Sequence, residues 1–266
     1  MLHAPASMHR DAGAGCGARA RQTWHESRRL AERHRRYAEG RGVTERDWWR
    51  TARQSLPRLA VIVRHLRPTF TLEGLESLDP AFCAQHGVRG LIWDVDGTLT
   101  SYHGSETSRA IRPAVDALFQ APGLRHVILS NCGEARFLEL GGMFPAVPVL
   151  KAYGTGSGLI RRRLLAGRDE WMPEGPREGA VPIRKPSAEL VEFALAELGV
   201  SAAGALMVGD QYWTDVAGAR MAGVRSVKLP TLERGTFPRA LRVLQGLEGA
   251  LSRLTGPGRM TEKRAG

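Results

Sequence analysis

Two aspartates one residue apart, Asp94 and Asp96, follow a short apolar run at residues 90–93. Side chains alternate along an extended backbone, so both carboxylates lie on the same side of the chain. Carboxylates this close repel each other unless a cation or a shared proton relieves the repulsion, and Mg²⁺ prefers such oxygen ligands. The pair therefore indicates a site where one aspartate binds a metal and attacks phosphorus while the other moves a proton.

A second pair of acids, Asp210 and Asp215, comes after the apolar run at residues 205–208. We expect these carboxylates to complete the metal shell that Asp94 and Asp96 begin. In open α/β sheets, ligands bind beyond the carboxyl ends of the strands, where residues in such positions meet.

Three further residues are candidates for binding a phosphoryl group. Ser130, with Asn131 beside it, ends the run at residues 126–129 and offers a hydroxyl to a phosphoryl oxygen. Lys185 offers a positive charge that offsets negative charge developing on those oxygens. Lys151 is a rival for this role, because it also follows an apolar run.

The elements that must position these residues can be read from the pattern after Val88, where short apolar runs alternate with amphipathic stretches. This alternation is typical of βαβ units and a parallel sheet. The four candidate strands are residues 89–96, 125–131, 204–210 and 224–230, and the expected helices are residues 110–120, 134–140, 187–198 and 215–222. The first three strands end in the polar residues named above, so the fold should gather them in one crevice.

The positive charge of the chain is concentrated near its N-terminus. Lys and Arg outnumber Asp and Glu by 38 to 27 overall, and residues 1–66 alone carry 14 Arg and no Lys against 6 acids. Residues 41–67 mix tryptophan, aliphatic and arginine side chains, which suits either packing on the domain or lying on an anionic membrane surface. Charge alone does not decide whether the basic arm binds lipid, binds nucleic acid or is simply surrounded by solvent.

From these patterns we expect a chain of four regions. We also expect a cytoplasmic protein, which would be peripheral at the membrane if the basic segment binds lipid. The chain shows no secretory signal and no run near the ~18 apolar residues of a membrane span. Its three cysteines, Cys16, Cys83 and Cys132, form no CxxC pattern, which argues against a disulfide framework or a zinc site. The regions are a disordered or loosely helical basic arm (1–40), an amphipathic segment packing on or beside the core (41–80), the α/β domain (81–250) and a disordered tail (251–266).

The order of these motifs resembles that of the haloacid-dehalogenase-like (HAD) phosphohydrolase superfamily over about residues 88–230. The matching pattern is DxDGT, then a strand ending in Ser, then Lys before Pro and a helix, then GDxxxxD. The resemblance implies a Rossmann-like sheet flanked by helices, and it favours Lys185 over Lys151. It also implies that Asp94 forms an aspartyl-phosphate and Asp96 acts as general acid and base. Mg²⁺ would be held by Asp94, the Asp96 carbonyl and Asp210, with support from Asp215, while Thr98, Ser130, Asn131 and Lys185 would hold the phosphoryl group.

A narrower resemblance is to subclass IIIA, in the branch that includes phosphatidylglycerophosphate phosphatases. Pro68, Leu72, Leu75, Leu78 and Gly87 fit the short run that precedes the first motif in that branch. Two features depart from it: Gly97 stands where members tend to carry Asn, and residues 152–183 lengthen the path between the second and third motifs. This insertion could be a small lid or a surface loop.

Only about ten residues separate Thr98 from the first expected helix, too few for a large cap domain, so the site should be open to bulky substrates. The resulting hypothesis is a Mg²⁺-dependent phosphomonoester hydrolase, with phosphatidylglycerophosphate as the first substrate to test. The aspartate at position 96 favours hydrolysis. Phosphomutases share this aspartate, so it does not by itself separate hydrolysis from phosphoryl transfer. The alternatives are a soluble sugar-phosphate or nucleotide phosphatase, and an RNA- or ribosome-binding protein that uses the fold as a scaffold.

Overall fold

The computed structural model describes residues 59–254 except 157 and 175–178. The predictions for the basic arm, for most of the amphipathic segment and for residues 255–266 lie outside the described residues. Every described residue belongs to one compact unit of the chain, Val43–Gly266.

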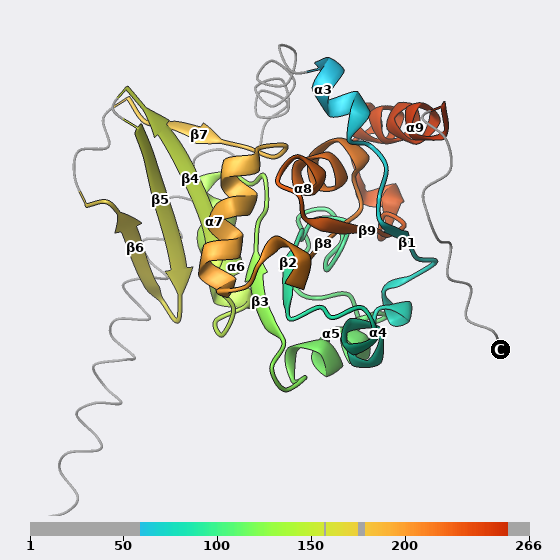
Figure 1. Ribbon diagram of the computed structural model, residues 1–266, viewed down its shortest axis with the longest axis horizontal. Helices are drawn as coiled ribbons and strands as arrows, with labels where there is room; N and C mark the ends of the chain where they lie inside the picture. The colour runs from blue at the N-terminus through green and yellow to red at the C-terminus, as the bar shows by residue number, and fades with distance from the viewer. Residues whose placement is uncertain (1–58, 157, 175–178, 255–266) are drawn as a thin grey trace, which may run out of the picture. The chain divides into compact units, whose positions relative to one another are not determined.

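A mixed β-sheet forms the centre of this unit (Figure 1). The described strands follow the order β1-β9-β8-β2-β3-β4-β5-β6, and β7 pairs with β4. Neighbours from β1 to β4 are parallel, whereas β5, β6 and β7 are antiparallel to their partners. The bounds are β1 Phe70–Thr71, β2 Gly90–Trp93, β3 Arg125–Ile128, β4 Val149–Thr155, β5 Gly158–Leu165, β6 Arg168–Met172, β7 Val181–Ile183, β8 Ala205–Gly209 and β9 Arg225–Lys228.

Helices cover both faces of the parallel part of the sheet, which is the predicted Rossmann-like arrangement. The α-helices are α3 Leu59–Arg64, α4 Pro80–Gln85, α5 Arg112–Phe119, α6 Glu134–Met143, α7 Ala188–Leu198, α8 Ala217–Met221 and α9 Arg239–Leu254. Short 3₁₀ turns lie at Leu75–Ser77, Ala202–Gly204 and Arg234–Thr236, and a π-helical turn at Tyr212–Val216 leads into α8.

The side chains of β2 show how the two layers form. Leu91 and Trp93 point into the core shared with α4, α5 and α6, while Ile92 points into the core shared with α7 and α8. All four residues of β2 are buried, as expected for a parallel strand covered on both sides. The strand that carries Asp94 at its end is therefore held rigidly.

The four predicted strands and four predicted helices are confirmed, with boundaries that differ by a few residues. The sheet also gains β1 at its edge, beside β9. Phe70, Leu72, Leu75 and Leu78 belong to the main hydrophobic core, so the end of the predicted N-terminal segment is built into the domain.

The predicted insertion at residues 152–183 adds strands to the sheet. The described residues of this segment complete β4 and form β5, β6 and β7, so the segment is regular antiparallel structure rather than a surface loop. The sequence predicted a parallel sheet, and the structure adds three antiparallel strands to it next to β4. The role of the segment as a lid remains a prediction.

The C-terminal helix α9 continues to Leu254, so the first residues of the predicted disordered tail are helical. Within the described part of the chain, no helix combines the length and apolar character needed to cross a bilayer.

Candidate active site

The site begins where β2 and β8 end, because these strands lie side by side in the sheet. Trp93 pairs with Val208, which brings Asp94 and Asp210 to the same edge. Asp215 joins them from the π-helical turn that follows β8. One carboxylate oxygen from each of the three aspartates lies within 4.8 Å of the others, and all three residues are buried.

Two glycines allow this close approach. Gly97 has a φ of +91°, and a Cβ there would lie 2.8 Å from Oδ2 of Asp210 and 2.7 Å from the Phe237 ring. A Cβ at Gly209 would overlap the Asp215 carboxylate. The glycine that departs from the branch pattern is therefore required here by its backbone conformation and by the nearness of Asp210.

Lys185 bridges two of the three clustered aspartates. Its Nζ donates to Oδ1 of Asp94 at 2.7 Å and to Oδ1 of Asp215 at 2.6 Å, and the residue is only 2% exposed. Burial opposes the charge on this lysine, but the carboxylates of Asp215 and Asp94 outweigh burial and raise its pKa. Lys185 is therefore a permanently charged ammonium within the cluster.

Asn131 holds the backbone of Lys185 in place. Its Oδ1 accepts from the Lys185 amide at 2.7 Å, and its Nδ2 donates to the Lys185 carbonyl at 2.9 Å. The sequence marked Asn131 as a phosphate-binding candidate. In the structure both ends of its amide are used to position the lysine.

The charge balance of the cluster suits a divalent cation. Three aspartates face the ion-paired ammonium of Lys185, and the charge of Lys228 also acts on Asp210. Among the described residues, Oδ1 of Asp210 is buried without a hydrogen-bond partner. Burial raises the pKa of Asp94 to about 7; Lys185 opposes this rise and Asp215 adds to it. Burial also raises the pKa of Asp210, and the charge of Asp94 raises it further. A hard oxygen-binding cation such as Mg²⁺ would relieve both the repulsion and the unpartnered oxygen, so these residues fit the metal.

The side chain of Asp96 is held apart from this cluster. Its Oδ1 accepts from Arg136 Nη2 at 2.8 Å and from the His103 amide at 3.2 Å. Arg136 is buried and also donates to the Gly104 carbonyl at 2.9 Å. Metal binding through the Asp96 carboxylate is therefore not favoured by this geometry, and binding through its carbonyl remains a prediction.

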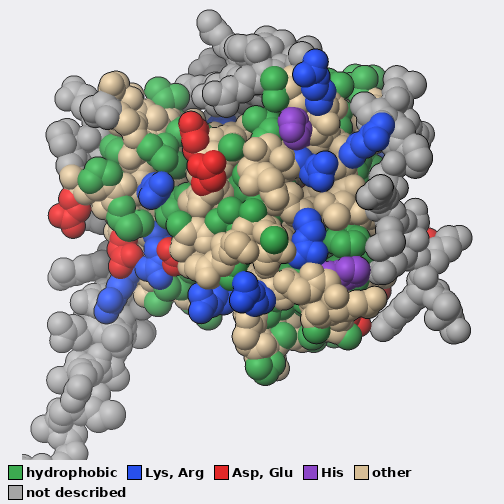
Figure 2. Space-filling view, viewed as in Figure 1, with side chains coloured by type: hydrophobic (Ala, Val, Ile, Leu, Met, Phe, Trp, Pro, Cys, Tyr) green, Lys and Arg blue, Asp and Glu red, His purple; other side chains and the backbone are tan. Residues whose placement is uncertain are grey.

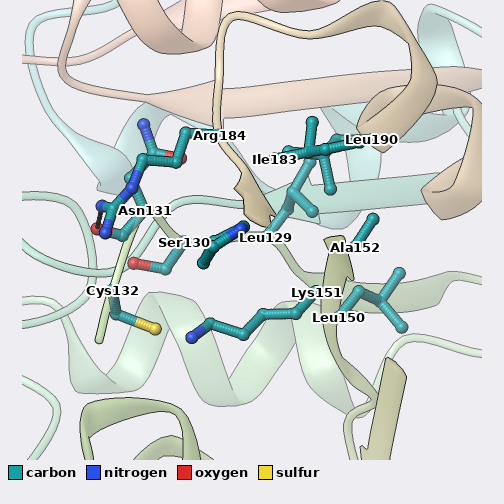
Figure 3. A pocket seen from close by; sticks show the side chains of 11 residues that line it. Leu129, Ser130, Asn131, Cys132, Leu150, Lys151, Ala152, Ile183, Arg184 and Leu190 are labelled. Carbon is teal, nitrogen blue, oxygen red and sulfur yellow. Dashed lines mark hydrogen bonds between the residues drawn. The ribbon is translucent and has the colours of Figure 1, made fainter. Parts of the chain in front are cut away.

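Thr98 and Ser130 lie at the ends of the strands as predicted. The Thr98 hydroxyl is buried and donates to Oδ2 of Asp94 at 3.4 Å. Ser130 lines a small pocket with Asn131, Lys151 and Arg184 (Figure 3).

Lys151, the rival lysine, takes a different place. Its Nζ donates to Oε1 of Glu134 at 2.7 Å and lies 5.4 Å from the centre of the Phe137 ring. Arg162 and Tyr153 also bind Glu134, so Lys151 joins a network that ties β4 and β5 to α6. The structure therefore brings Lys185, and not Lys151, against Asp94.

Two groups of site residues were missed by the sequence analysis. Arg136 orients Asp96, and α9 places Gln245 and Glu248 behind the cluster. Gln245 Nε2 donates to Oδ2 of Asp210 at 3.3 Å, and Glu248 accepts from the Trp213 amide at 3.4 Å. No motif marked these residues. The available signal was a Gln and a Glu three positions apart in an amphipathic stretch.

Comparisons with known proteins agree with this site. Residues 182–235, which contain Lys185, Asp210 and Asp215, match a family model described as HAD-hydrolase-like. A stretch of 60 residues is 47% identical to a phosphoserine phosphatase of Thermus thermophilus, and this stretch is 23% of the chain and 23% of that relative. The chain therefore spans about a quarter of that relative's length. The family match thus covers the part of the chain that carries three of the clustered site residues.

Among solved structures, the chain is similar to an uncharacterized protein from Listeria monocytogenes serotype 4b. The TM-score is 0.36 at 18% sequence identity, over 60% of this chain and 99% of that one.

Proposed function

We propose that this protein is a Mg²⁺-dependent phosphomonoester hydrolase that works through an aspartyl-phosphate at Asp94. The observation that carries the proposal is the contact of Lys185 with Asp94 and Asp215, beside the unpartnered Oδ1 of Asp210. Residues from separate motifs thereby surround one carboxylate at the end of a buried strand. The HAD-hydrolase-like match over residues 182–235 supports the same reading.

Asp94, Asp210, Asp215 and the Asp96 carbonyl would hold the metal. When bound, Mg²⁺ supplies positive charge that offsets the charge of the aspartates and of the substrate's phosphoryl oxygens. Lys185 shares this work beside Asp94, and Thr98 and Ser130 offer hydroxyls to the same oxygens.

In the first step an Asp94 oxygen attacks phosphorus, and the bond from phosphorus to the leaving oxygen breaks. Protonated Asp96 donates its proton to that oxygen, so the product leaves as a neutral alcohol. The interactions described for Asp96 all involve Oδ1, so Oδ2 is the oxygen suited to carry the proton.

In the second step water attacks the phosphorus of the aspartyl-phosphate. Asp96, now ionised, takes a proton from the water while the bond from phosphorus to Asp94 breaks. Inorganic phosphate leaves, and both carboxyl groups return to their starting states.

A phosphate on a bulky carrier is the substrate class that the surroundings of the site favour. Between Thr98 and Arg112, where α5 begins, the chain forms turns and bends without a helix or strand, so no cap domain is inserted there. Phosphatidylglycerophosphate is the first substrate to test. Phosphoserine, the substrate in the name of the Thermus relative, belongs in the same panel with sugar phosphates and nucleotides.

The test is a phosphate-release screen over this panel with Mg²⁺, comparing the wild-type protein with the near-isosteric Asp94→Asn variant. We expect release from at least one substrate, dependence on Mg²⁺, and loss of release in the variant. Release that survives in Asp94→Asn would contradict the nucleophile, and no release from any monoester would contradict the function.

A further inference from the structure

Helix α9 turns polar side chains toward the protein, together with the half-buried Leu241 and Leu244. Gln245 contacts Asp210, and Glu248, which is 3% exposed, accepts from the Trp213 amide. Ser252, one turn further along, is 8% exposed. A surface helix of a globular protein normally turns its apolar side chains inward, so α9 is unusual in burying polar groups while it exposes apolar ones.

The outward face of α9 is correspondingly apolar. Val243 is 64% exposed, Leu247 58% and Leu251 40%. Positions four residues apart lie above one another on a helix, so the three side chains form one stripe along α9. They are half of the large hydrophobic residues that are strongly exposed within the described residues, the others being Val61, Met172 and Val181. A grouped apolar stripe of this kind marks a contact surface, whereas single exposed residues do not.

The charges around the stripe select the partner. Glu248 is the only acidic residue of α9, and it is buried on the inner face. Arg239 is exposed at the start of the helix. In the 3₁₀ turn before the helix, the exposed Arg234 follows the exposed Glu233, so these two charges offset each other. The outer face of α9 thus offers apolar and positively charged groups without a carboxylate, which complements an anionic lipid surface. Figure 2 shows one face of the molecule, on which side chains of both charges lie among hydrophobic ones.

We propose that the outer face of α9, defined by Val243, Leu247 and Leu251, docks on an anionic lipid bilayer with the helix lying in the plane of the interface. Three side chains on one helix make too small an area for a stable dimer between copies of this chain, which needs about 1,000 Å² or more. An amphipathic helix, by contrast, is sufficient for reversible binding at a bilayer surface.

Docking leaves the aspartate cluster undisturbed, because Asp210 lies on the opposite side of α9 from the stripe. A helix with its side chains is about 10 Å across, so the candidate active site would stand about that far from the lipid headgroups. The docking itself does not depend on the proposed function, since it is measured without turnover.

The experiment is co-sedimentation of the full chain with vesicles of phosphatidylcholine alone, and of equal parts phosphatidylcholine and phosphatidylglycerol. We expect binding to the mixed vesicles, weakened roughly tenfold in the Leu247→Asp variant. Val181→Asp is the matched control, because Val181 is 55% exposed but lies on β7. A milder variant, Leu247→Gln, guards against a folding defect, and circular dichroism checks both.

Each other outcome overturns the proposal. Equal binding of wild type, Leu247→Asp and Val181→Asp would assign any lipid binding to the basic N-terminal residues and not to α9. Absence of vesicle binding would exclude lipid as the occupant of the stripe. A wild-type dimer in light scattering that Leu247→Asp converts to a monomer would identify a second copy of this chain as the occupant.

Discussion

The ammonium nitrogen of Lys185 lies 2.7 Å from Oδ1 of Asp94, although the two residues are 91 positions apart in the sequence. The contact is buried, and Asn131 holds the backbone of the lysine by two hydrogen bonds. A charge placed this way stabilises both the ionised nucleophile and the phosphoryl oxygens that approach it.

Replacing Lys185 by Met should lower phosphate release on the order of a hundredfold or more, because it removes a preorganised charge from the reacting centre. Lys151→Met is the matched control, since Lys151 is also buried and ion-paired but contacts Glu134. Initial rates and melting temperatures of both variants decide the matter. Activity that survives in Lys185→Met and is lost in Lys151→Met would reverse the assignment.

Arg136 should act on catalysis through Asp96. In Arg136→Met the Asp96 carboxylate loses its 2.8 Å partner, so we expect kcat to fall roughly tenfold to a hundredfold with little change in KM. Arg112→Met serves as the control, because the Arg112 side chain is 46% exposed and pairs with Glu106 at the surface. Equal kinetics of the two variants would show that Arg136 is not a positioning residue.

Gln245 should support metal binding through Asp210. Removing the amide in Gln245→Ala frees Oδ2 of Asp210, and we expect the Mg²⁺ concentration for half-maximal activity to rise roughly tenfold to a hundredfold. The stabilisation of the protein by Mg²⁺ in thermal melts should weaken in parallel, which gives a readout apart from activity. Gln85→Ala, on the exposed end of α4, should change neither quantity. An unchanged Mg²⁺ dependence in Gln245→Ala would remove Gln245 from the site.

The stability of the fold should depend on the protonation of His126. Trp93 Nε1 can only donate, so Nδ1 of His126 accepts at 3.2 Å and Nε2–H donates to the Leu118 carbonyl at 3.1 Å, which requires a neutral ring. Burial lowers the pKa of His126 from 6.5 to about 4, against the opposing effect of the Leu118 carbonyl.

The unfolded chain binds this proton below pH 6.5 and the folded chain only below about 4. The stabilisation is therefore complete above pH 6.5 and is lost as the pH falls toward 4. Urea unfolding of wild type and His126→Gln across this window checks the sign. The free energy of unfolding should decline with falling pH more steeply in the wild type, by up to one bound proton, and parallel curves would refute the assignment.

The sequence predicted the parallel strands because apolar runs ended in polar residues, and physical rules place such endings at one edge of a sheet. It did not predict β5 and β6, because residues 152–183 are rich in Gly, Pro and Arg and were interpreted as a small lid or a surface loop. In the structure Arg162 is 6% exposed: it is paired with Glu134 and Asp169, and its guanidinium lies 4.5 Å from the Phe137 ring centre and 4.4 Å from that of Trp171. Such burial requires partners from distant elements, which local pattern does not reveal.

The candidate site shows the same division. Asp94, Asp210, Asp215 and Lys185 were identifiable because each occupies a motif position at the end of a strand or the start of a helix. Arg136 and Gln245 were not, since each is an ordinary helix residue until the fold sets it beside Asp96 or Asp210. The outward apolar face of α9 likewise follows from tertiary contacts, because periodicity alone would have turned that face inward.

The most direct measurement is to trap the covalent intermediate. The protein is mixed with Mg²⁺ and a hydrolysed monoester, quenched during turnover, reduced with borohydride and digested for mass spectrometry of the peptide that contains Asp94 and Asp96. We expect the acyl phosphate to be reduced at Asp94, with no such product from Asp94→Asn. Reduction at Asp96, or steady turnover with no reduced carboxyl group at either position, would contradict the nucleophilic role of Asp94.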